Sequence, residues 1–299
     1  MTLSPSNTAV DRTGRELVEH GTAAFPIACY HDDLLVEEVL WHWHEELEAG
    51  IITEGTAVIT IGQEKHIVSA GEGFFINSGI LHGAYSLDRS SCLIHSLVFH
   101  PRLVGGSSDS IFYQRYLRPL TGDPTLDWIH LSPEISWQSE ALSALEDTWY
   151  SCMKEEEGYD FHVRSTLSTL VFLLCRNHPK SGHQPSTKAL RDGERIKKML
   201  SCIHEYYGSE LNVQTIAASA SISESECLRC FRGTIGISPI QYLKQHRLRQ
   251  AAAQILSTSE KVSDIAERCG FQDISYFTKS FREMFGCTPT EYRHKKSQP

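Results

Sequence analysis

Two stretches in the C-terminal third of the chain repeat one pattern, and this repeat constrains the fold more than any other feature. Residues 213–242 align with residues 262–292 at an offset of 49 positions in the first half and 50 in the second. The matched pairs are Val213 and Val262, Ile216 and Ile265, Ala217 and Ala266, Phe231 and Phe281, Arg232 and Arg282, Gly236 and Gly286, Pro239 and Pro289, and Tyr242 and Tyr292. The one-residue slip falls between the two matched blocks, where a turn absorbs an insertion at little cost. The chain is therefore expected to contain one structural unit twice.

Each copy reads as helix, tight turn, helix. Ser223 is a good N-cap for the second helix of the first copy, which is expected to end near Gly236. Asp273 and Gly286 have the same roles in the second copy. Residues 239–257 begin with proline and are expected to form a long helix between the copies. Two such units on a linking helix are a DNA-binding arrangement, because a second helix lying in the major groove can read base edges.

Charge also separates this third from the rest of the chain. Residues 1–192 carry 13 Lys and Arg against 26 Asp and Glu, whereas residues 193–299 carry 15 against 11. The formal net charges are therefore −13 and +4. A C-terminal module of the opposite sign indicates an anionic partner for that module.

Composition limits the remaining classes of protein. A chain of 299 residues, 40% hydrophobic and 22% charged, is expected to fold into about two globular domains. Its longest apolar run, residues 167–175, is shorter than the roughly 20 residues that span a bilayer. The polar N-terminus has no signal-peptide pattern. Nine cysteines without a pairing framework indicate reduced thiols, so a cytoplasmic location without a membrane partner is expected.

Residues 270–293, GFQDISYFTKSFREMFGCTPTEYR, resemble the C-terminal signature of the AraC/XylS family of bacterial transcription regulators. The upstream copy falls where that family has its first helix-turn-helix unit. The resemblance implies that the second helix of each unit faces the bases and that an arginine one turn further along contacts phosphate. The positions carried over are Ser225, Leu228, Arg229 and Arg232 in the first unit, and Ser275, Tyr276, Lys279 and Arg282 in the second. A helical bundle without a DNA role is the alternative.

Residues 25–100 alternate between short strand-like runs and glycine-rich turns, which is typical of a double-sheet or barrel fold. The stretch WHWHEELEAGIITEG (41–55) resembles the first cupin motif, and residues 71–86 resemble the second, with Asn77 in place of the motif's proline. In metal-binding cupins the resemblance implies the metal ligands His42, His44, Glu48 and His82. AraC-type regulators carry a similar stretch in a sensor domain, where it usually lines a small-molecule pocket without metal.

The small-molecule pocket is the favoured prediction for this chain. Its effector-binding residues are predicted to be His42, His44, Glu46, Glu48 and His82, with no metal and no other cofactor. Two alternatives stay open: the four cupin-motif residues hold a metal ion, or they are structural polar residues. Sugars are a common effector class for this architecture, but these residues do not distinguish a sugar from an aromatic compound or an acid.

The predicted domain order has four parts. An N-terminal arm (1–24) precedes the cupin-like sensor domain (25–177), a linker (178–193) and the AraC-type DNA-binding domain (194–299). Apolar residues at helical spacing predict helices at about 135–177. The family resemblance implies that these helices pair two chains, and packing wholly within the sensor domain is the alternative.

The sequence therefore predicts an α+β two-domain protein, with an N-terminal cupin-like β-barrel and a C-terminal all-α domain of two helix-turn-helix units. The predicted function is that of a one-component bacterial transcription regulator, not an enzyme. Its predicted partners are double-stranded promoter DNA, a small-molecule effector, a second copy of the chain and, for an activator, RNA polymerase. The alternatives are a metal-dependent cupin enzyme fused to a DNA-binding tail, and a repressor without an effector.

Overall fold

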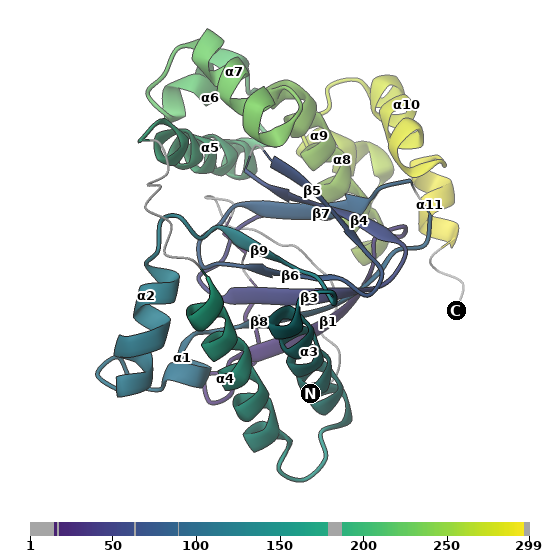
Figure 1. The fold of residues 1–299 in the computed structure, drawn as a ribbon. Coiled ribbons are helices and arrows are strands. Elements are labelled where there is room, and N and C mark those ends of the chain that lie inside the picture. Colours follow the sequence, from purple (N-terminus) through teal and green to yellow (C-terminus); the bar gives the residue numbers. More distant parts are fainter. Residues whose placement is uncertain (1–14, 17, 63, 89, 179–186, 296–299) are drawn as a thin grey trace. The chain divides into compact units, whose positions relative to one another are not determined.

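The computed structural model describes residues 15–16, 18–62, 64–88, 90–178 and 187–295. They form two compact units that meet in the chain at Leu190 and Arg191. The first unit is built on strands and the second is helical (Figure 1). Within the described ranges, no helix is both long enough and apolar enough to cross a membrane.

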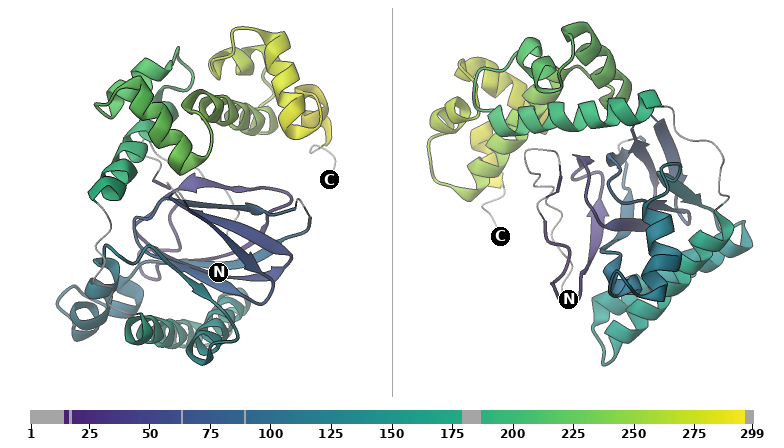
Figure 2. Two further views of the ribbon diagram at one scale, coloured as in Figure 1. Left: turned by 45° about the horizontal axis from the view of Figure 1, so that its top comes forward. Right: turned by 90° about the vertical axis from the view of Figure 1, so that its left-hand side faces the viewer.

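The strands of the first unit form two antiparallel sheets (Figure 2). The five-stranded sheet has the order β1 (Ile27–Asp33), β8 (Leu93–Phe99), β3 (Leu47–Glu54), β6 (Gly73–Ile76) and β9 (Trp128–Leu131). The four-stranded sheet has the order β2 (Val39–His42), β7 (His82–Ser86), β4 (Thr56–Ile61) and β5 (Glu64–Ser69). Apart from the consecutive strands β4 and β5, neighbours in each sheet are far apart in the chain. The double-sheet fold expected from the sequence is confirmed.

Alternation along β3 places polar residues between the two sheets. Leu47 and Ala49 pack into the core under the helices, whereas Ile52 packs into the core between the sheets. Because successive side chains of a strand point to opposite faces, Glu48 lies on the same face as Ile52. The sequence of this strand thus directs one carboxylate into the interior of the barrel.

Helices cover the outer face of the five-stranded sheet. The helical elements of this unit are α1 (Arg102–Gly105), η1 (Tyr113–Leu117), α2 (Arg118–Thr121), α3 (Ser136–Lys154) and α4 (Tyr159–Asn177). Trp149 of α3 anchors this layer, because its indole N–H donates a 2.8 Å hydrogen bond to the carbonyl of Tyr30 in β1. Its ring also stacks on His95 of β8, with ring centroids 3.5 Å apart.

The second unit consists of helices in the order expected for a duplicated helix-turn-helix. They are α5 (Thr187–Tyr206), α6 (Val213–Ser219), α7 (Glu224–Ile235), α8 (Pro239–Ser257), α9 (Val262–Arg268), α10 (Ile274–Phe285) and α11 (Pro289–Lys295). Half of the linker expected at 178–193, residues 179–186, lies outside the described residues. Helix α5 already begins at Thr187, so the end of the expected linker is helical.

Local capping fixes the two recognition helices where the sequence predicts them. The side chain of Ser223 accepts a hydrogen bond from the backbone N–H of Glu226, and Asp273 accepts one from Tyr276. Each helix ends at a glycine with positive φ, 84° at Gly236 and 73° at Gly286, which releases the chain from the helix. These expected helix starts and ends are confirmed.

The turns of the two units differ at one corresponding position. Ser221 and Gly270 both have positive φ, 56° and 82°, but only glycine adopts this region without steric cost. We expect Ser221→Gly to raise the free energy of unfolding of the helical unit by about 0.5–1 kcal/mol. The backbone strain of a left-handed serine in the folded state exceeds the conformational entropy that glycine adds to the unfolded chain. Urea unfolding followed by circular dichroism measures the change. A loss of stability would contradict this interpretation of the turn.

Candidate functional site

The predicted base-facing residues lie on the open faces of α7 and α10. In α7, the side chains of Ser225 and Arg229 are exposed and that of Leu228 is half-buried. In α10, Ser275, Tyr276 and Lys279 are all exposed. The opposite faces are occupied by core residues, among them Cys227, Cys230 and Phe231 in α7, and Phe277 and Phe281 in α10. Each helix thus presents a polar face to solvent while its apolar face packs.

Cys227 and Cys230 are structural. Both thiols are buried and free, and burial raises the pKa of each to about 11. A protonated, inaccessible thiol is a poor metal ligand and nucleophile. Core packing therefore accounts for this pair.

Charged side chains contact the two recognition helices in different ways. Arg229 lies 3.7 Å from Glu226 of the same helix, and Glu226 also pairs with Arg195 of α5 at 3.2 Å. On the second helix, Lys244 from α8 lies 5.1 Å above the ring of Tyr276. Lys244 was not predicted from the sequence, because its place beside α10 depends on how α8 and α10 cross. Its positive charge was the only available signal.

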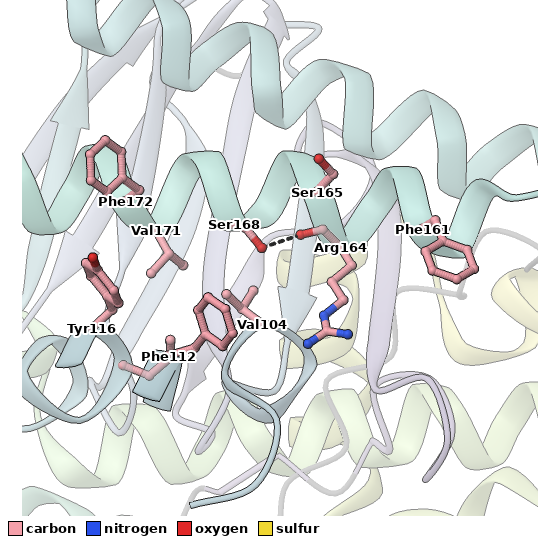
Figure 3. Close-up of a pocket in the computed structure, with 10 residues that line it drawn as sticks. Val104, Phe112, Tyr116, Phe161, Arg164, Ser165, Ser168, Val171 and Phe172 are labelled. Atoms are coloured by element: carbon pink, nitrogen blue, oxygen red, sulfur yellow. Dashed lines mark hydrogen bonds between the residues drawn. The ribbon is translucent and has the colours of Figure 1, made fainter. Parts of the chain in front are cut away.

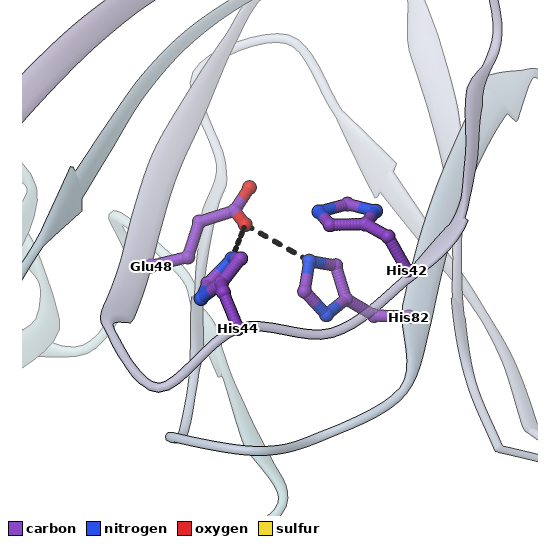
Figure 4. A group of neighbouring side chains, drawn as sticks. All are labelled: His42, His44, Glu48 and His82. Atoms are coloured by element: carbon purple, nitrogen blue, oxygen red, sulfur yellow. Dashed lines mark hydrogen bonds and ion pairs between the residues drawn. The ribbon is translucent and has the colours of Figure 1, made fainter. Parts of the chain in front are cut away.

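Four of the five predicted effector-binding side chains converge inside the barrel. We call His42, His44, Glu48 and His82 the sensor cluster (Figure 4). They come from β2, the turn after it, β3 and β7, and their four candidate ligand atoms lie within 4.8 Å of one another. All three histidines are at most 4% exposed. Glu46 is not among the converging groups.

Hydrogen bonds to the backbone fix the orientation of each imidazole. The Nδ1 atoms lie 2.8 Å from the carbonyl of Leu40 for His42, 3.1 Å from that of Glu46 for His44, and 2.8 Å from that of Ile80 for His82. A carbonyl oxygen only accepts, so each Nδ1 carries the proton and each Nε2 faces the cluster. The Glu48 carboxylate then lies 3.1 Å from Nε2 of His44 and 2.9 Å from Nε2 of His82.

Burial and charge set the ionisation of this interior. Burial, with repulsion from His82, lowers the pKa of His42 to about 3, so its imidazole is neutral at physiological pH. Burial raises the pKa of Glu48, but His82 and His44 outweigh that effect and hold it well below the ordinary carboxyl value. The cluster thus combines an ionised carboxylate with inward-facing imidazole nitrogens, which suits a polar ligand or a cation.

Two further residues, Glu16 and His20, belong to this site. Glu16 lies 3.6 Å from Nε2 of His42 and 3.2 Å from Nε2 of His20, and its side chain is 10% exposed. The other ring nitrogen of His20 contacts the hydroxyl of Tyr30 at 2.8 Å. From the sequence this stretch was expected to be an N-terminal arm, and neither residue was predicted to belong to the site. Their four-residue spacing was the available signal.

Comparisons with known proteins define the class of the two units. Residues 25–171 match the model of the AraC-like ligand binding domain, and residues 216–295 match that of a helix-turn-helix domain. A ligand-binding barrel followed by a double helix-turn-helix unit defines a ligand-responsive transcription regulator. The chain belongs to the AraC family of regulators.

Two curated relatives align along most of this chain. The chain is 27% identical over 296 residues to the uncharacterized HTH-type transcriptional regulator YdeC of Bacillus subtilis, covering 97% of this chain and 99% of that one. It is 26% identical to the HTH-type transcriptional activator RhaR of Mannheimia succiniciproducens, covering 85% and 87% of the two chains. Among solved structures, an AraC-type regulator from Chromobacterium violaceum is 27% identical, with a TM-score of 0.34, covering 35% of this chain and 94% of that one.

Proposed function

We propose that the chain is a one-component regulator in which ligand binding at the sensor cluster changes how the two helix-turn-helix units engage promoter DNA. The observation that carries the proposal is the convergence of four buried polar side chains within the ligand-binding unit of a DNA-binding regulator. Coupling between two such sites is typically worth about 1–3 kcal/mol, which changes DNA affinity roughly 5- to 150-fold. In this proposal the chain has no enzymatic activity and acts in the cytoplasm.

The residues proposed to contact DNA have two roles. Arg229 and Lys279 are long cations that reach base edges in the major groove, and Arg and Lys commonly pair there with guanine O6 and N7. Ser225, Ser275 and Tyr276 each offer one hydrogen-bonding group, whereas the half-buried Leu228 offers an apolar contact. Arg232 and Arg282, exposed one turn further along, bind phosphates and position the helices without reading sequence.

For the regulator as a whole we propose transcription activation. The relative RhaR from Mannheimia succiniciproducens is named a transcriptional activator. An activator brings RNA polymerase to a promoter, so a surface of this chain would contact the polymerase. Transcription in vitro from a captured promoter, with and without the protein, decides between activation and repression.

A groove beside α4 is proposed to hold a second copy of the chain (Figure 3). The groove has a volume of about 450 Å³ and lies where α4 meets α1 and η1. Its lining residues are Val104, Phe112, Tyr116, Leu117, Phe161, Arg164, Ser165, Ser168, Val171 and Phe172. Phe161 is 80% exposed and Phe112 56% exposed. Exposed aromatic side chains around one groove are typical of a protein interface, and a homodimer would let two DNA readers act together.

We expect Phe161→Asp to convert the proposed dimer to monomers at micromolar concentration. A charge in the desolvated centre of an interface costs about 2 kcal/mol or more, which weakens association roughly 30-fold. Sedimentation velocity over a concentration series measures the change. Ile67→Asp is the matched control, since Ile67 is 59% exposed on β5. A dimer that survives Phe161→Asp unchanged would place the interface elsewhere.

Capture of fragmented genomic DNA from the source organism by the full-length protein tests the proposed function. We expect enrichment of sites that contain two major-groove elements about one helical turn, roughly 10 base pairs, apart. The same capture with a variant that combines Arg229→Ala and Lys279→Ala serves as the control. Equal recovery by both proteins, or no enrichment over a range of salt concentration, would contradict the proposal.

A further inference from the structure

We propose that the sensor cluster binds a divalent transition-metal ion through His42, His44, His82 and Glu48, and that Glu16 supplies a further carboxylate from the N-terminal segment, so that metal binding fastens this segment to the barrel. The proposal deepens the proposed sensing role of the cluster and rests on it for the effect on DNA. It replaces the metal-free pocket predicted from the sequence.

The orientation of the imidazoles carries the proposal. Each Nδ1 is hydrogen-bonded to a backbone carbonyl, so each Nε2, the nitrogen that can coordinate an ion, faces the cluster. The Glu48 carboxylate lies 3.1 Å from Nε2 of His44 and 2.9 Å from Nε2 of His82. Three imidazole nitrogens and one carboxylate that converge in this way form a donor set for a shared cation.

The distances between the donor atoms also fit a metal ion. Metal bonds to imidazole nitrogen and carboxylate oxygen are about 2.0–2.2 Å long, so ligand atoms on opposite sides of an ion lie up to about 4.3 Å apart. The four candidate atoms already lie within 4.8 Å of one another, so only a small contraction is needed. Backbone hydrogen bonds to the second nitrogen of each imidazole orient the rings as in metal sites. Three imidazoles with one carboxylate suit first-row ions such as Zn²⁺, Ni²⁺, Co²⁺ or Mn²⁺.

Glu16 links the cluster to the N-terminal segment. Its backbone N–H donates a 2.9 Å hydrogen bond to the carbonyl of Trp43, between His42 and His44 in the chain. Arg15 bridges to Trp43 in parallel register and pairs with Glu45 at 3.4 Å. These contacts hold the Glu16 carboxylate 3.6 Å from Nε2 of His42. The hydrogen bonds of Glu48 go to the other two imidazoles, those of His44 and His82. An ion bound by His42 would therefore attract Glu16 and retain the segment.

Metal binding by the full-length protein without a polyhistidine tag tests the proposal. The protein is stripped with a chelator, titrated with Zn²⁺, Ni²⁺, Co²⁺ and Mn²⁺ separately, and its metal content is measured by mass spectrometry. We expect one ion per chain for the wild type. Glu48→Gln is expected to fold, because its amide N–H can donate to an imidazole lone pair, and to bind at least 100-fold more weakly. No ion retained at micromolar metal, or wild-type affinity in Glu48→Gln, would overturn the metal site.

The role of Glu16 is tested separately from the site itself. Glu16→Gln is expected to bind the ion about 10-fold more weakly, since residues that support the ligands of a metal typically contribute 10- to 100-fold. Glu46→Gln, in the turn that carries His44 but outside the cluster, is the matched control. In the wild type, metal is expected to slow hydrogen exchange at residues 15–20, and Glu16→Gln should lose this protection. Equal protection in both proteins would overturn the role of Glu16.

DNA affinity measured with and without metal separates this proposal from the proposed function. A change of DNA affinity that depends on metal, and is absent in Glu48→Gln, supports both. Stoichiometric metal binding without any change in DNA affinity supports the metal site and overturns the sensing role. DNA binding by a wild-type protein that retains no metal overturns the metal site and leaves the DNA-binding function standing.

Discussion

Replacing Lys279 by alanine is expected to weaken binding to the preferred DNA site roughly 5- to 150-fold, the effect of losing about 1–3 kcal/mol of base readout. Lys279 is exposed on α10, one turn after Tyr276, on the face opposite Phe277 and Phe281. Discrimination at one base pair should fall with affinity. If Lys279 contacts only phosphate, its loss would instead weaken binding to all sequences alike. The salt dependence of binding would then fall by about one released ion.

Fluorescence anisotropy with the captured site and with single-base variants measures both quantities. Lys198→Ala is the matched control, because Lys198 is exposed on α5 and its loss removes the same charge without touching α7 or α10. Unchanged affinity of Lys279→Ala for the preferred site would show that α10 does not read DNA through this face.

Arg282→Ala is expected to lower affinity for every sequence.

Gly270→Ala is expected to destabilise the helical unit by about 3 kcal/mol, the sum of a left-handed backbone cost and an overpacking cost. Gly270 has a φ of 82° in the turn between α9 and α10. A Cβ at this position would lie 2.7 Å from the carbonyl oxygen of Tyr207 and 2.8 Å from the guanidinium of Arg247. Arg247 donates hydrogen bonds to that carbonyl and to the carbonyl of Ser209, so the methyl group would disturb both.

The arrangement of tryptophans provides an internal control for Gly270→Ala. All five lie in the first unit, at positions 41, 43, 128, 137 and 149. Tryptophan fluorescence therefore follows the barrel unit, whereas helical circular dichroism is dominated by the helices of both units. We expect the fluorescence transition in urea to stay at its wild-type midpoint while DNA binding is lost. A variant that binds DNA normally would show that the turn tolerates a side chain.

The helical unit was predictable from sequence because its signals are local. A helix cap depends on residues three positions apart, as in Ser223 and Asp273, and a glycine with positive φ ends each recognition helix. The duplication adds support, because the same helix-turn-helix pattern occurs in both copies. The exact start of α5 was not predictable, because residues 187–193 contain a glycine and lack clear periodicity.

The sensor cluster was predictable only in part. His42, His44 and Glu48 lie within seven residues of one another, and the cupin motif adds His82 from a second stretch. Their convergence required β2 to pair with β7, with His42 opposite His82, and β3 to face them from the other sheet. Such pairings join residues tens of positions apart, so only the folded chain shows that the donor atoms meet.

By itself the sequence determined the class of the protein, its domain order and the solvent-exposed faces of α7 and α10, because each depends on residues close together in the chain. Tertiary structure decided which polar groups share a site. It placed Glu16 beside His42 through a backbone bridge to Trp43, and it left Glu46 outside the cluster although Glu46 lies between two of its members. Side-chain direction on a strand and the approach of a distant segment follow from sheet pairing, which the spacing of residues in the sequence does not encode.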